Sequence, residues 1–314
     1  MIKKNKAIFL LILTFALVFS FLGCSGTTDL SDSSEDNVKN NTSFPITITD
    51  SYNRTVTLGS EPQKIISIAP NITEIIFSLG ESDKLIGRSE YCDYPEDVKN
   101  IPSVGSLTDP NLEKIVELKP DLVIVSPIVP EEIIAKLDEL GLKVVSFHGK
   151  ENFDGTYEII ENVARVLNDN ESAEKLISEM KAKVQSVVDK VKDEPKVSTY
   201  YALSFGKSGD YTAGSDTFIG EMIELAGGNN IADDISGWAY SLEKLVEKNP
   251  DIIICSKYSD SKQGIENSNG YKDLDAIKNG KLYEIDNNLL DRQGPRVADG
   301  LVEIAKIIHP EVFK

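Results

Sequence analysis

The sequence predicts an α/β protein made of two similar lobes that one long helix joins. Three observations predict this fold. Buried-strand patterns alternate with helical patterns along most of the 314 residues, which favours parallel sheets covered by helices. One sixteen-residue pattern occurs twice with nine identical positions, as NLEKIVELKPDLVIVS at 111–126 and SLEKLVEKNPDIIICS at 241–256. Between the copies lies one continuous apolar stripe, long enough for a helix of about 30 Å.

Residues 1–23 are typical of an export signal and are not expected to belong to the fold. Lys3, Lys4 and Lys6 form a basic start, and an apolar run follows from 7 to 22, which is the signal-peptide pattern. The stretch FLGCSG then resembles a bacterial lipobox, with Phe21 where the usual pattern has Leu. We therefore expect Cys24 to be the lipid-modified first residue of the mature chain. An ordinary signal peptide with an incidental cysteine is the alternative.

Residues 24–43 are predicted to form a flexible tether, because Ser, Asp, Asn and Thr offer little apolar surface to bury. A lipid with a tether anchors a protein to a membrane without spanning it, so we expect an extracytoplasmic protein that touches the cell membrane through its lipid alone. The formal net charge of −18 argues against a nucleic-acid partner. Cys92 and Cys255 are expected to be free thiols, although the oxidising environment of an exported protein also allows a disulfide between them.

The first lobe is expected over residues 44–168. Alternating apolar and polar residues around Asp-Ser-Tyr-Asn predict a hairpin within 46–58. Residues 64–69 are expected to form a buried strand that Pro70 ends. Asn71 followed by Glu74 has the spacing of a helix cap, and Gly80 is expected to end that helix. The remaining patterns predict helices at 111–118, 131–140 and 154–167, and strands at 122–125 and 144–147.

The linking helix is expected over residues 169–194, with Asn170 as its cap and Pro195 as its stop. Its apolar stripe consists of Ala173, Leu176, Ile177, Met180, Val184, Val187, Val188 and Val191. A second lobe over residues 195–314 then repeats the alternation. Its predicted elements are a strand at 196–203, a helix at 217–226, the second copy of the repeat, a strand at 281–285 and a helix at 297–308.

The helix of the repeat is expected to present one apolar and one acidic face in each lobe. Acidic residues in a first helical turn are favoured by the helix macrodipole, and duplication alone would place Glu at the same step twice. The residues expected inside are Leu112, Ile115 and Val116 in the first copy and Leu242, Leu245 and Val246 in the second. Those expected outside are Glu113, Lys114, Glu117, Glu243, Lys244 and Glu247.

Four stretches carry a resemblance to a known family: KIISIAPNITEIIFSLG, EYCDYPEDVKNIPSVGS, DPNLEKIVELKPDLVI and DRQGPRVADGLVEIAKIIHP. From 44 to 314 the chain resembles the periplasmic-type substrate-binding proteins of ABC importers that carry cobalamin, ferric siderophores or haem. The resemblance implies the class III periplasmic-binding-protein fold with a ligand cleft between the lobes, and a monomer that is not an enzyme and has no cofactor. It also implies that Glu113 and Glu243 dock onto Arg residues of a dimeric permease, which works with an ATPase.

The candidate ligand-binding residues follow the ends of predicted strands, where a large chelate would meet apolar walls and a few polar groups. They are Pro70, Asn71, Tyr91, Leu107, Phe205, Trp238, Tyr240, Arg292 and Arg296, with Tyr94 and Ser106 as further candidates. Packing explains Tyr94 and Phe205 equally well. The two arginines could bind ligand carboxylates or phosphate through bidentate bonds, or form salt bridges with Asp291 or Asp299.

Within the family the pattern YxDYP, present from Tyr91 to Pro95, is most similar to cobalamin binders and predicts a corrinoid ligand. Leu107 stands where the cobalamin protein has Trp, and Asn288 stands near where it has Asp, so a ferric siderophore or haem is the alternative. His148 and His309 are too few for a bare-metal carrier, and no metal site is expected. A nitrogenase-like or chelatase-like enzyme and a surface sensor or adhesin are the alternatives from other classes. Against an enzyme, the sequence has no Gly-rich phosphate loop and no cysteine cluster.

Overall fold

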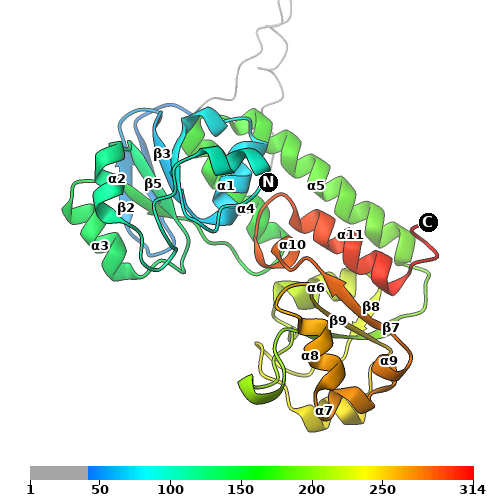
Figure 1. Ribbon diagram of the computed structural model, residues 1–314. Coiled ribbons are helices and arrows are strands. Elements are labelled where there is room, and N and C mark those ends of the chain that lie inside the picture. Colours follow the sequence, from blue (N-terminus) through cyan, green and yellow to red (C-terminus); the bar gives the residue numbers. More distant parts are fainter. Residues whose placement is uncertain (1–41) are drawn as a thin grey trace, which may run out of the picture. The chain divides into compact units, whose positions relative to one another are not determined.

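The computed structural model describes residues 42–314, which lie in one compact unit of the chain. The expected signal segment, Cys24 and all but the last two residues of the tether lie outside the described residues. Within the described part, no helix combines the length and the apolar character that crossing a membrane requires. Helices and strands are labelled as in Figure 1.

The first lobe holds an antiparallel hairpin and a four-stranded parallel sheet. The hairpin pairs Ile46 with Leu58 and turns at the expected Asp-Ser-Tyr-Asn stretch. The sheet has the order β4-β3-β5-β6. The strands are β1 (Ile46–Thr49), β2 (Thr55–Leu58), β3 (Ile65–Ile68), β4 (Leu85–Arg88), β5 (Leu122–Val125) and β6 (Val144–Ser146). The helices are α1 (Pro70–Ser78), α2 (Leu112–Leu118), α3 (Glu131–Glu139) and α4 (Phe153–Leu167), with short 3-10 helices η1 (Ser82–Lys84) and η2 (Glu96–Asn100).

The second lobe holds a parallel sheet in the order β10-β9-β7-β8. Its strands are β7 (Val197–Ala202), β8 (Gly228–Asn230), β9 (Ile252–Ser256) and β10 (Leu282–Ile285). Its helices are α6 (Phe218–Leu225), α7 (Leu242–Lys248), α8 (Ser261–Asn267), α9 (Asp275–Lys278), α10 (Asn288–Asp291) and α11 (Val297–Ile308), with 3-10 helices η3 (Gly206–Ser208) and η4 (Tyr271–Asp273).

The two sheets have the same topology, which accounts for the repeated pattern. In each sheet the strands lie in the order second, first, third, fourth, counted along the chain. The repeat forms α2 and β5 in one lobe and α7 and β9 in the other. Both faces of each sheet are covered, so β5 is buried at all four positions, as expected for a parallel strand between helix layers. The predicted fold of two similar α/β lobes is confirmed.

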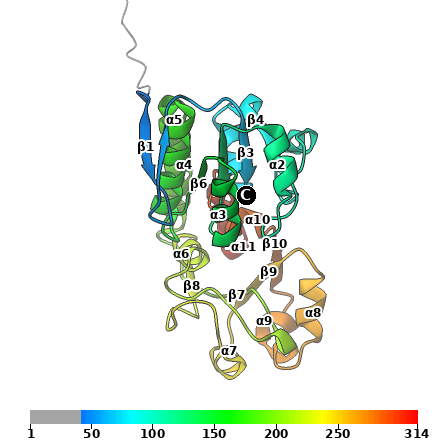
Figure 2. The ribbon, with the colours of Figure 1, turned by 90° about the vertical axis from the view of Figure 1, so that its left-hand side faces the viewer.

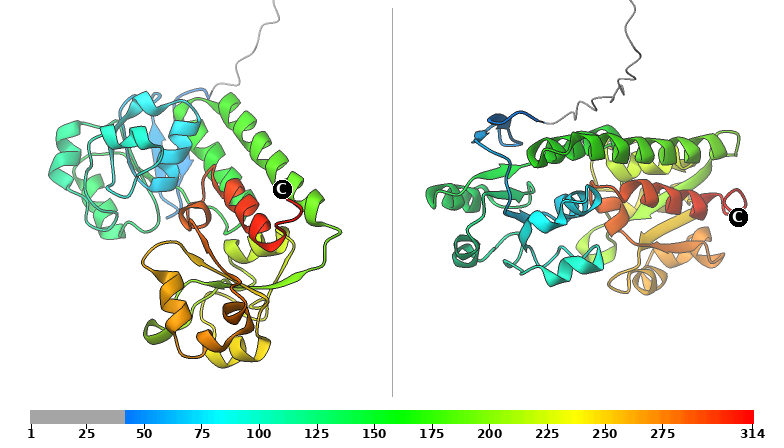
Figure 3. Two further views of the ribbon diagram at one scale, coloured as in Figure 1. Left: turned by 45° about the vertical axis from the view of Figure 1, so that its right-hand side comes forward. Right: turned by 90° about the horizontal axis from the view of Figure 1, so that it is seen from above.

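The linking helix α5 (Asn170–Val191) packs against α4 of the first lobe and α11 of the second. Figure 3 shows α5 running beside α11. Asp169 caps the helix and not Asn170, because its carboxylate accepts a hydrogen bond from the Ser172 amide at 3.3 Å. The predicted stripe forms the packed face, with Ala173, Ile177, Met180, Val187 and Val191 buried and the other three partly buried.

One hydrophobic core runs through both lobes. It joins the inner face of the first sheet, α1, α4 and α5 to α6, α11 and the inner face of the second sheet. At the contact between lobes the rings of Phe153 and Phe218 meet edge-on, with centroids 5.0 Å apart. Figure 2 shows α4 and α5 side by side behind the hairpin. Separate clusters fill the outer face of each sheet. Sliding the lobes apart would expose part of the shared core, so large relative motion is disfavoured.

Two further local expectations were wrong, and five elements were not predicted. The helix at 71–80 begins at Pro70 and has no side-chain cap, because Asn71 and Glu74 bind the other lobe instead. Val116 and Val246 were expected inside, but they are 40% and 47% exposed. Strands β4 and β8 and helices α8 to α10 had not been predicted. The expectation of free thiols is confirmed, since Cys92 and Cys255 are both buried and unpaired.

Candidate ligand-binding site

The carboxyl ends of the strands mark the candidate site in both lobes. In an open parallel sheet, ligands bind beyond these ends, at the point where the strand order reverses. That point lies between β3 and β5 in the first sheet and between β7 and β9 in the second. Pro70 and Asn71 follow β3, and Phe205 follows β7. Three of the predicted ligand residues therefore lie at the two switch points.

The first turn of α1, which follows β3, binds the segment after α10 across the lobes. The Asn71 side-chain amide donates to the Gln293 carbonyl at 3.1 Å. The Gln293 side-chain amide in turn donates to the Lys150 carbonyl at 2.7 Å. Gly294 lies beside Asn71 as well, and a Cβ at that position would make only an ordinary van der Waals contact, 3.4 Å from the Asn71 backbone oxygen. Asn71 thus has a structural partner in addition to its predicted place at the ligand.

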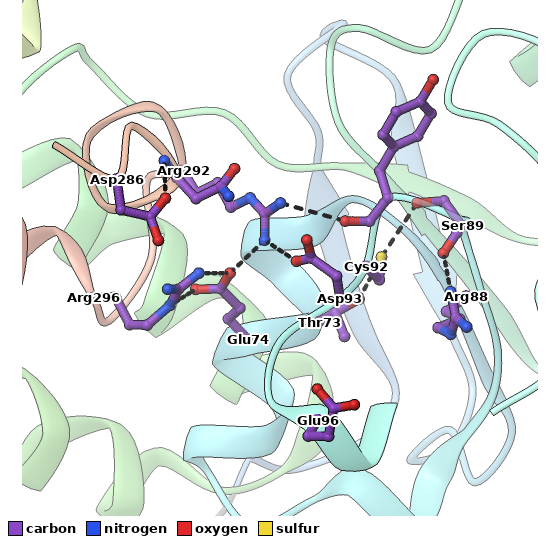
Figure 4. A network of polar contacts seen from close by, with 12 residues as sticks. Thr73, Glu74, Arg88, Ser89, Cys92, Asp93, Glu96, Asp286, Arg292 and Arg296 are labelled. Carbon is purple, nitrogen blue, oxygen red and sulfur yellow. Dashed lines mark hydrogen bonds and ion pairs between the residues drawn. The ribbon is translucent and has the colours of Figure 1, made fainter. Parts of the chain in front are cut away.

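Glu74 of α1 is the centre of an ion-pair network that joins the two lobes (Figure 4). Its side chain is 2% exposed. Arg296 binds it with two bonds, Nε to Oε2 at 2.9 Å and Nη2 to Oε1 at 2.6 Å. Arg292 Nη1 lies 3.0 Å from Glu74 Oε1 and 2.6 Å from Asp93 Oδ1, and its Nη2 donates to the Tyr91 carbonyl at 3.4 Å. The two arginines and the two carboxylates balance in charge.

The network keeps both arginines charged. Burial alone would lower the pKa of Arg292, but hydrogen bonds to Asp93 and Glu74 outweigh it and raise the pKa. For Arg296, burial is again the largest influence, and the bonds to Glu74 reverse its direction. The predicted alternative partners were wrong, because Asp291 accepts from Asn287 and Asp299 pairs with Lys183. Ligand contact by the arginines stays a prediction, and a ligand anion would compete with Glu74 and Asp93.

Two exposed tyrosines lie beside this network on the loop after β4. Tyr91 is 53% exposed and Tyr94 is 47% exposed. The Arg296 guanidinium carbon lies 4.0 Å from the centre of the Tyr94 ring, within cation–π range. The loop is fixed from below by the buried Cys92 thiol, which lies 3.1 Å from Thr73 Oγ1 and 3.2 Å from Ser89 Oγ. A fixed loop with exposed rings is a suitable flat wall for a ring ligand.

Trp238 and Tyr240, on the segment after β8, lie in different environments. Trp238 is partly buried against the shared core, and its carbonyl accepts from the Thr212 amide at 2.7 Å. Tyr240 is 7% exposed, and its hydroxyl donates to the Ile231 carbonyl at 3.0 Å. The structure therefore places Tyr240 in the core of the second lobe, where it offers little surface to a ligand. Trp238, as a partly buried residue, is more exposed than Tyr240.

Phe205 is half-buried beside a hollow in the second lobe. Its ring packs edge-on to Tyr271, with centroids 6.2 Å apart. It also lies so close to Gly264 that a Cβ there would come within 2.5 Å of the ring. The hollow is about 530 Å³, within the range of small-molecule sites, and is lined by Phe205, Gly206, Lys207, Gly264, Asn267, Ser268 and Asn269. Phe205 therefore packs within the lobe and also lines the hollow, so the structure is compatible with both roles predicted for it.

Leu107 and Ser106 lie on the loop that precedes α2. Leu107 is half-buried and packs against the outer core of the first lobe. The Ser106 hydroxyl accepts from the Asp109 amide at 2.9 Å. The first lobe also has a hollow, of about 320 Å³. None of its lining residues is a predicted ligand residue; they are Leu58, Gly59, Ser60, Pro62, Pro120, Asp121, Gly141 and Lys143.

A polar cluster after β9 and β10 was not among the predicted residues. The Tyr258 hydroxyl donates to Asp286 Oδ1 and accepts from the Asn288 side-chain amide, both at 3.0 Å. Lys257 pairs with Asp286 at 3.0 Å. Burial would raise the pKa of Asp286, but bonds from Lys257 and Tyr258 outweigh it and lower the pKa. Their position after two predicted strands is the signal by which the sequence could have indicated these residues. The sequence comparison marks Asn288 only as a departure from the family pattern.

In the described part of the chain, neither histidine forms a hydrogen bond or ion pair with the side chains of the Glu74 network. His148 is exposed, and His309 is 2% exposed with Nε2 at 3.3 Å from the Gly227 carbonyl oxygen. Among the described residues, one group offers three side chains that could hold a metal ion, namely Glu194, His309 and Glu311, with ligand atoms within 4.8 Å of one another. Glu194 follows α5, and His309 and Glu311 follow α11. None of the three is a predicted ligand residue.

The predicted docking residues lie on two matching short helices. Glu113 and Glu243 are exposed in the first turns of α2 and α7. The Asn111 side chain caps α2 through the Lys114 amide at 2.9 Å. Ser241 caps α7 in the same way through the Lys244 amide at 3.2 Å. Each helix also ends at a residue in the left-handed conformation. Because the two helices have the same length, cap and end, the two carboxylates lie in equivalent local settings.

Comparisons with known proteins agree with this arrangement. A model of the periplasmic binding protein family matches residues 65–289. A relative in Bacillus subtilis, named as an uncharacterized ABC transporter substrate-binding lipoprotein, is 33% identical over 99% of both chains. The structure of the vitamin B12 binding protein BtuF of Vibrio cholerae superposes with a TM-score of 0.67 at 27% identity, covering 81% of this chain and 99% of that one. A possible iron-binding (periplasmic solute-binding) protein of Staphylococcus epidermidis superposes with a TM-score of 0.72 at 30% identity, covering 80% and 100%.

The fold and these comparisons define an extracytoplasmic ligand-binding protein of the class III periplasmic-binding type. The chain belongs to the periplasmic binding protein family and is a substrate-binding protein of an ABC importer of the cobalamin, siderophore and haem group. Proteins of this family are transport components and not enzymes, which excludes the chelatase-like alternative. A permease is therefore its partner class.

Proposed function

We propose that this protein binds cobalamin or a related corrinoid and delivers it to the permease. The observation that carries the proposal is the exposed aromatic pair Tyr91 and Tyr94, held on a fixed loop next to a network that joins the lobes. A corrin ring is large and flat with a polar periphery, and such ligands suit apolar walls with a few polar groups. The vitamin B12 binding protein of Vibrio cholerae is a relative over nearly its whole length, which supports the same ligand class.

Trp238 provides a direct test, because it is the only tryptophan of the chain. Cobalamin titrated into the protein is expected to quench its fluorescence and to release or absorb heat in a calorimeter. Trp238→Ala should weaken binding by about 1–3 kcal/mol, the scale of one large apolar contact. Tyr283→Ala is the matched control, since Tyr283 is an exposed aromatic on β10 outside the predicted site.

The same titration decides between the ligand classes. A ferric siderophore or haem is the second candidate, which is favoured by the iron-binding description of the Staphylococcus epidermidis relative. If cobalamin gives no heat and no quench, and a ferric siderophore or haem gives both, the ligand would be the siderophore or haem and not cobalamin. A neutral Trp238→Ala for whichever ligand binds would show that the site lies elsewhere.

The lobes are proposed to form a largely preformed site. Bending α5 would break backbone hydrogen bonds, and moving the lobes would break the Glu74 network and open the shared core. Affinity should then come from a site that changes little on binding. We also propose that Glu113 and Glu243 serve docking onto the two permease subunits and do not touch the ligand.

Cys24 is proposed to hold the protein at the extracytoplasmic face of the membrane through its lipid. Cys24→Ser is therefore expected to release the protein into the medium or to leave an unprocessed precursor, because the lipid-accepting thiol is gone. Cell fractionation with mass measurement of the chain checks this. Normal processing together with unchanged membrane retention would refute the anchor, and Cys255→Ser, a buried thiol in β9, is the control for cysteine loss.

A further inference from the structure

The two repeated helices expose the same apolar side chain. Val116 of α2 is 40% exposed and Val246 of α7 is 47% exposed, whereas Ile115 and Leu245 beside them are fully buried. Scattered exposed apolar residues are normal on protein surfaces. The same residue type exposed at the same step of both copies is a more specific observation, because packing within the lobes does not require it.

Acidic side chains flank each valine. Val116 lies three residues after Glu113 and directly before Glu117, and residues three apart share a helix face. Val246 has the same relation to Glu243 and Glu247 in the other lobe. Among the described residues, no hydrogen bond or ion pair is made by the side chain of Glu113, Glu117, Glu243 or Glu247. Each helix thus presents an apolar centre with unpaired negative charges around it.

We propose that Val116 and Val246 are the apolar anchors of the docking surface, each packed into an equivalent apolar spot bordered by basic residues on the two permease subunits. This inference rests on the proposed docking role of Glu113 and Glu243. An apolar centre with a charged rim is the usual anatomy of a protein interface, where the desolvated centre contributes most of the affinity. A pair of matching surfaces on one chain fits a partner made of two identical subunits, because each subunit then meets the same side chains.

The valines and the glutamates should differ in their response to salt. Ion pairs at an interface rim are screened, whereas burial of an apolar side chain is not. Val116→Ser or Val246→Ser should each weaken docking about ten-fold, and the loss should be similar at low and high salt. Glu113→Gln should weaken docking at low salt and much less at high salt. The double valine variant should lose about a hundred-fold if the two sites act independently.

The test measures binding of the full chain to the permease–ATPase complex encoded by its neighbouring genes, reconstituted in lipid nanodiscs, at two salt concentrations. Leu140→Ser is the control, because Leu140 is 52% exposed at the end of α3 and lies outside the repeat. Cobalamin binding by every variant should match the unaltered protein. Valine variants that dock like the unaltered protein would overturn the anchor role alone. Absence of docking by the unaltered protein would overturn the proposed function and the inference together.

Discussion

Glu74→Ala is expected to lower the free energy of unfolding by about 3–5 kcal/mol, the usual cost of removing one partner from a buried ion pair. Glu74 is 2% exposed and is the common partner of Arg292 and Arg296, whose side chains are only 13% and 15% exposed. Its loss would leave Arg296 without a carboxylate partner in the described part of the chain and Arg292 with Asp93 alone. Chemical denaturation followed by circular dichroism measures the change.

A matched surface pair separates this effect from the loss of any ion pair. Glu96 pairs with Lys99 at 2.8 Å, but its side chain is 81% exposed. Glu96→Ala should therefore change stability by no more than about 0.5 kcal/mol. Glu74→Gln should fall between the two, since the amide can still accept hydrogen bonds. Equal, small effects for Glu74→Ala and Glu96→Ala would show that the network between the lobes contributes little.

The order of the elements could be predicted because it depends on local patterns. Buried runs such as LVIV in β5 and capping residues such as Asn111 and Ser241 mark strand and helix ends within a few residues. Strand β8 could not be predicted in this way. Its sequence is GNN, which has no β-branched or aromatic residue, and it is a strand because β7 provides a neighbour.

The site was less predictable, because its key contacts join distant parts of the chain. Asn71 and Glu74 have the spacing of a helix cap, yet their partners are Gln293, Arg292 and Arg296, more than 200 residues away. Likewise, the sequence predicts that Arg292 and Arg296 bind ligand anions or pair with the nearby Asp291 or Asp299. Their partners in the structure are Glu74 and Asp93 of the other lobe. Local spacing cannot distinguish a carboxylate that caps its own helix from one that binds the other lobe.

Exposure was also hard to predict for single residues within a known element. Val116 is an aliphatic residue and Tyr240 is an aromatic residue, and both lie in or next to a helix that the sequence predicts. Val116 lies at the edge of the buried face of α2 and remains 40% exposed, whereas Tyr240 is 7% exposed because Tyr200 and Ile231 lie around it. These outcomes depend on the neighbouring elements, which a periodic pattern does not describe.

Charge reversal at the docking positions is expected to abolish most transport and to leave ligand binding intact. Glu113→Lys or Glu243→Lys should each cost about 2–5 kcal/mol of docking free energy if the carboxylate meets a close permease arginine, because a pair of like charges replaces an ion pair. Ligand affinity should stay within a few-fold, since no hydrogen bond or ion pair joins either side chain to a predicted ligand residue in the described part of the chain. Uptake of labelled cobalamin by cells and calorimetry on the purified variants measure the two effects separately.

Glu132→Lys is the matched control for this prediction. Glu132 is also an exposed glutamate in the first turn of a helix of the first lobe, α3, but it has no counterpart in the repeat. Its reversal should remove the same favourable interaction with a helix dipole and leave uptake unchanged. Restoring uptake by reversing the facing permease arginine to Glu would establish the contact. Normal uptake by Glu113→Lys and Glu243→Lys, or loss of ligand affinity in either, would reject the docking assignment, because the carboxylates would then serve no partner or would serve the ligand.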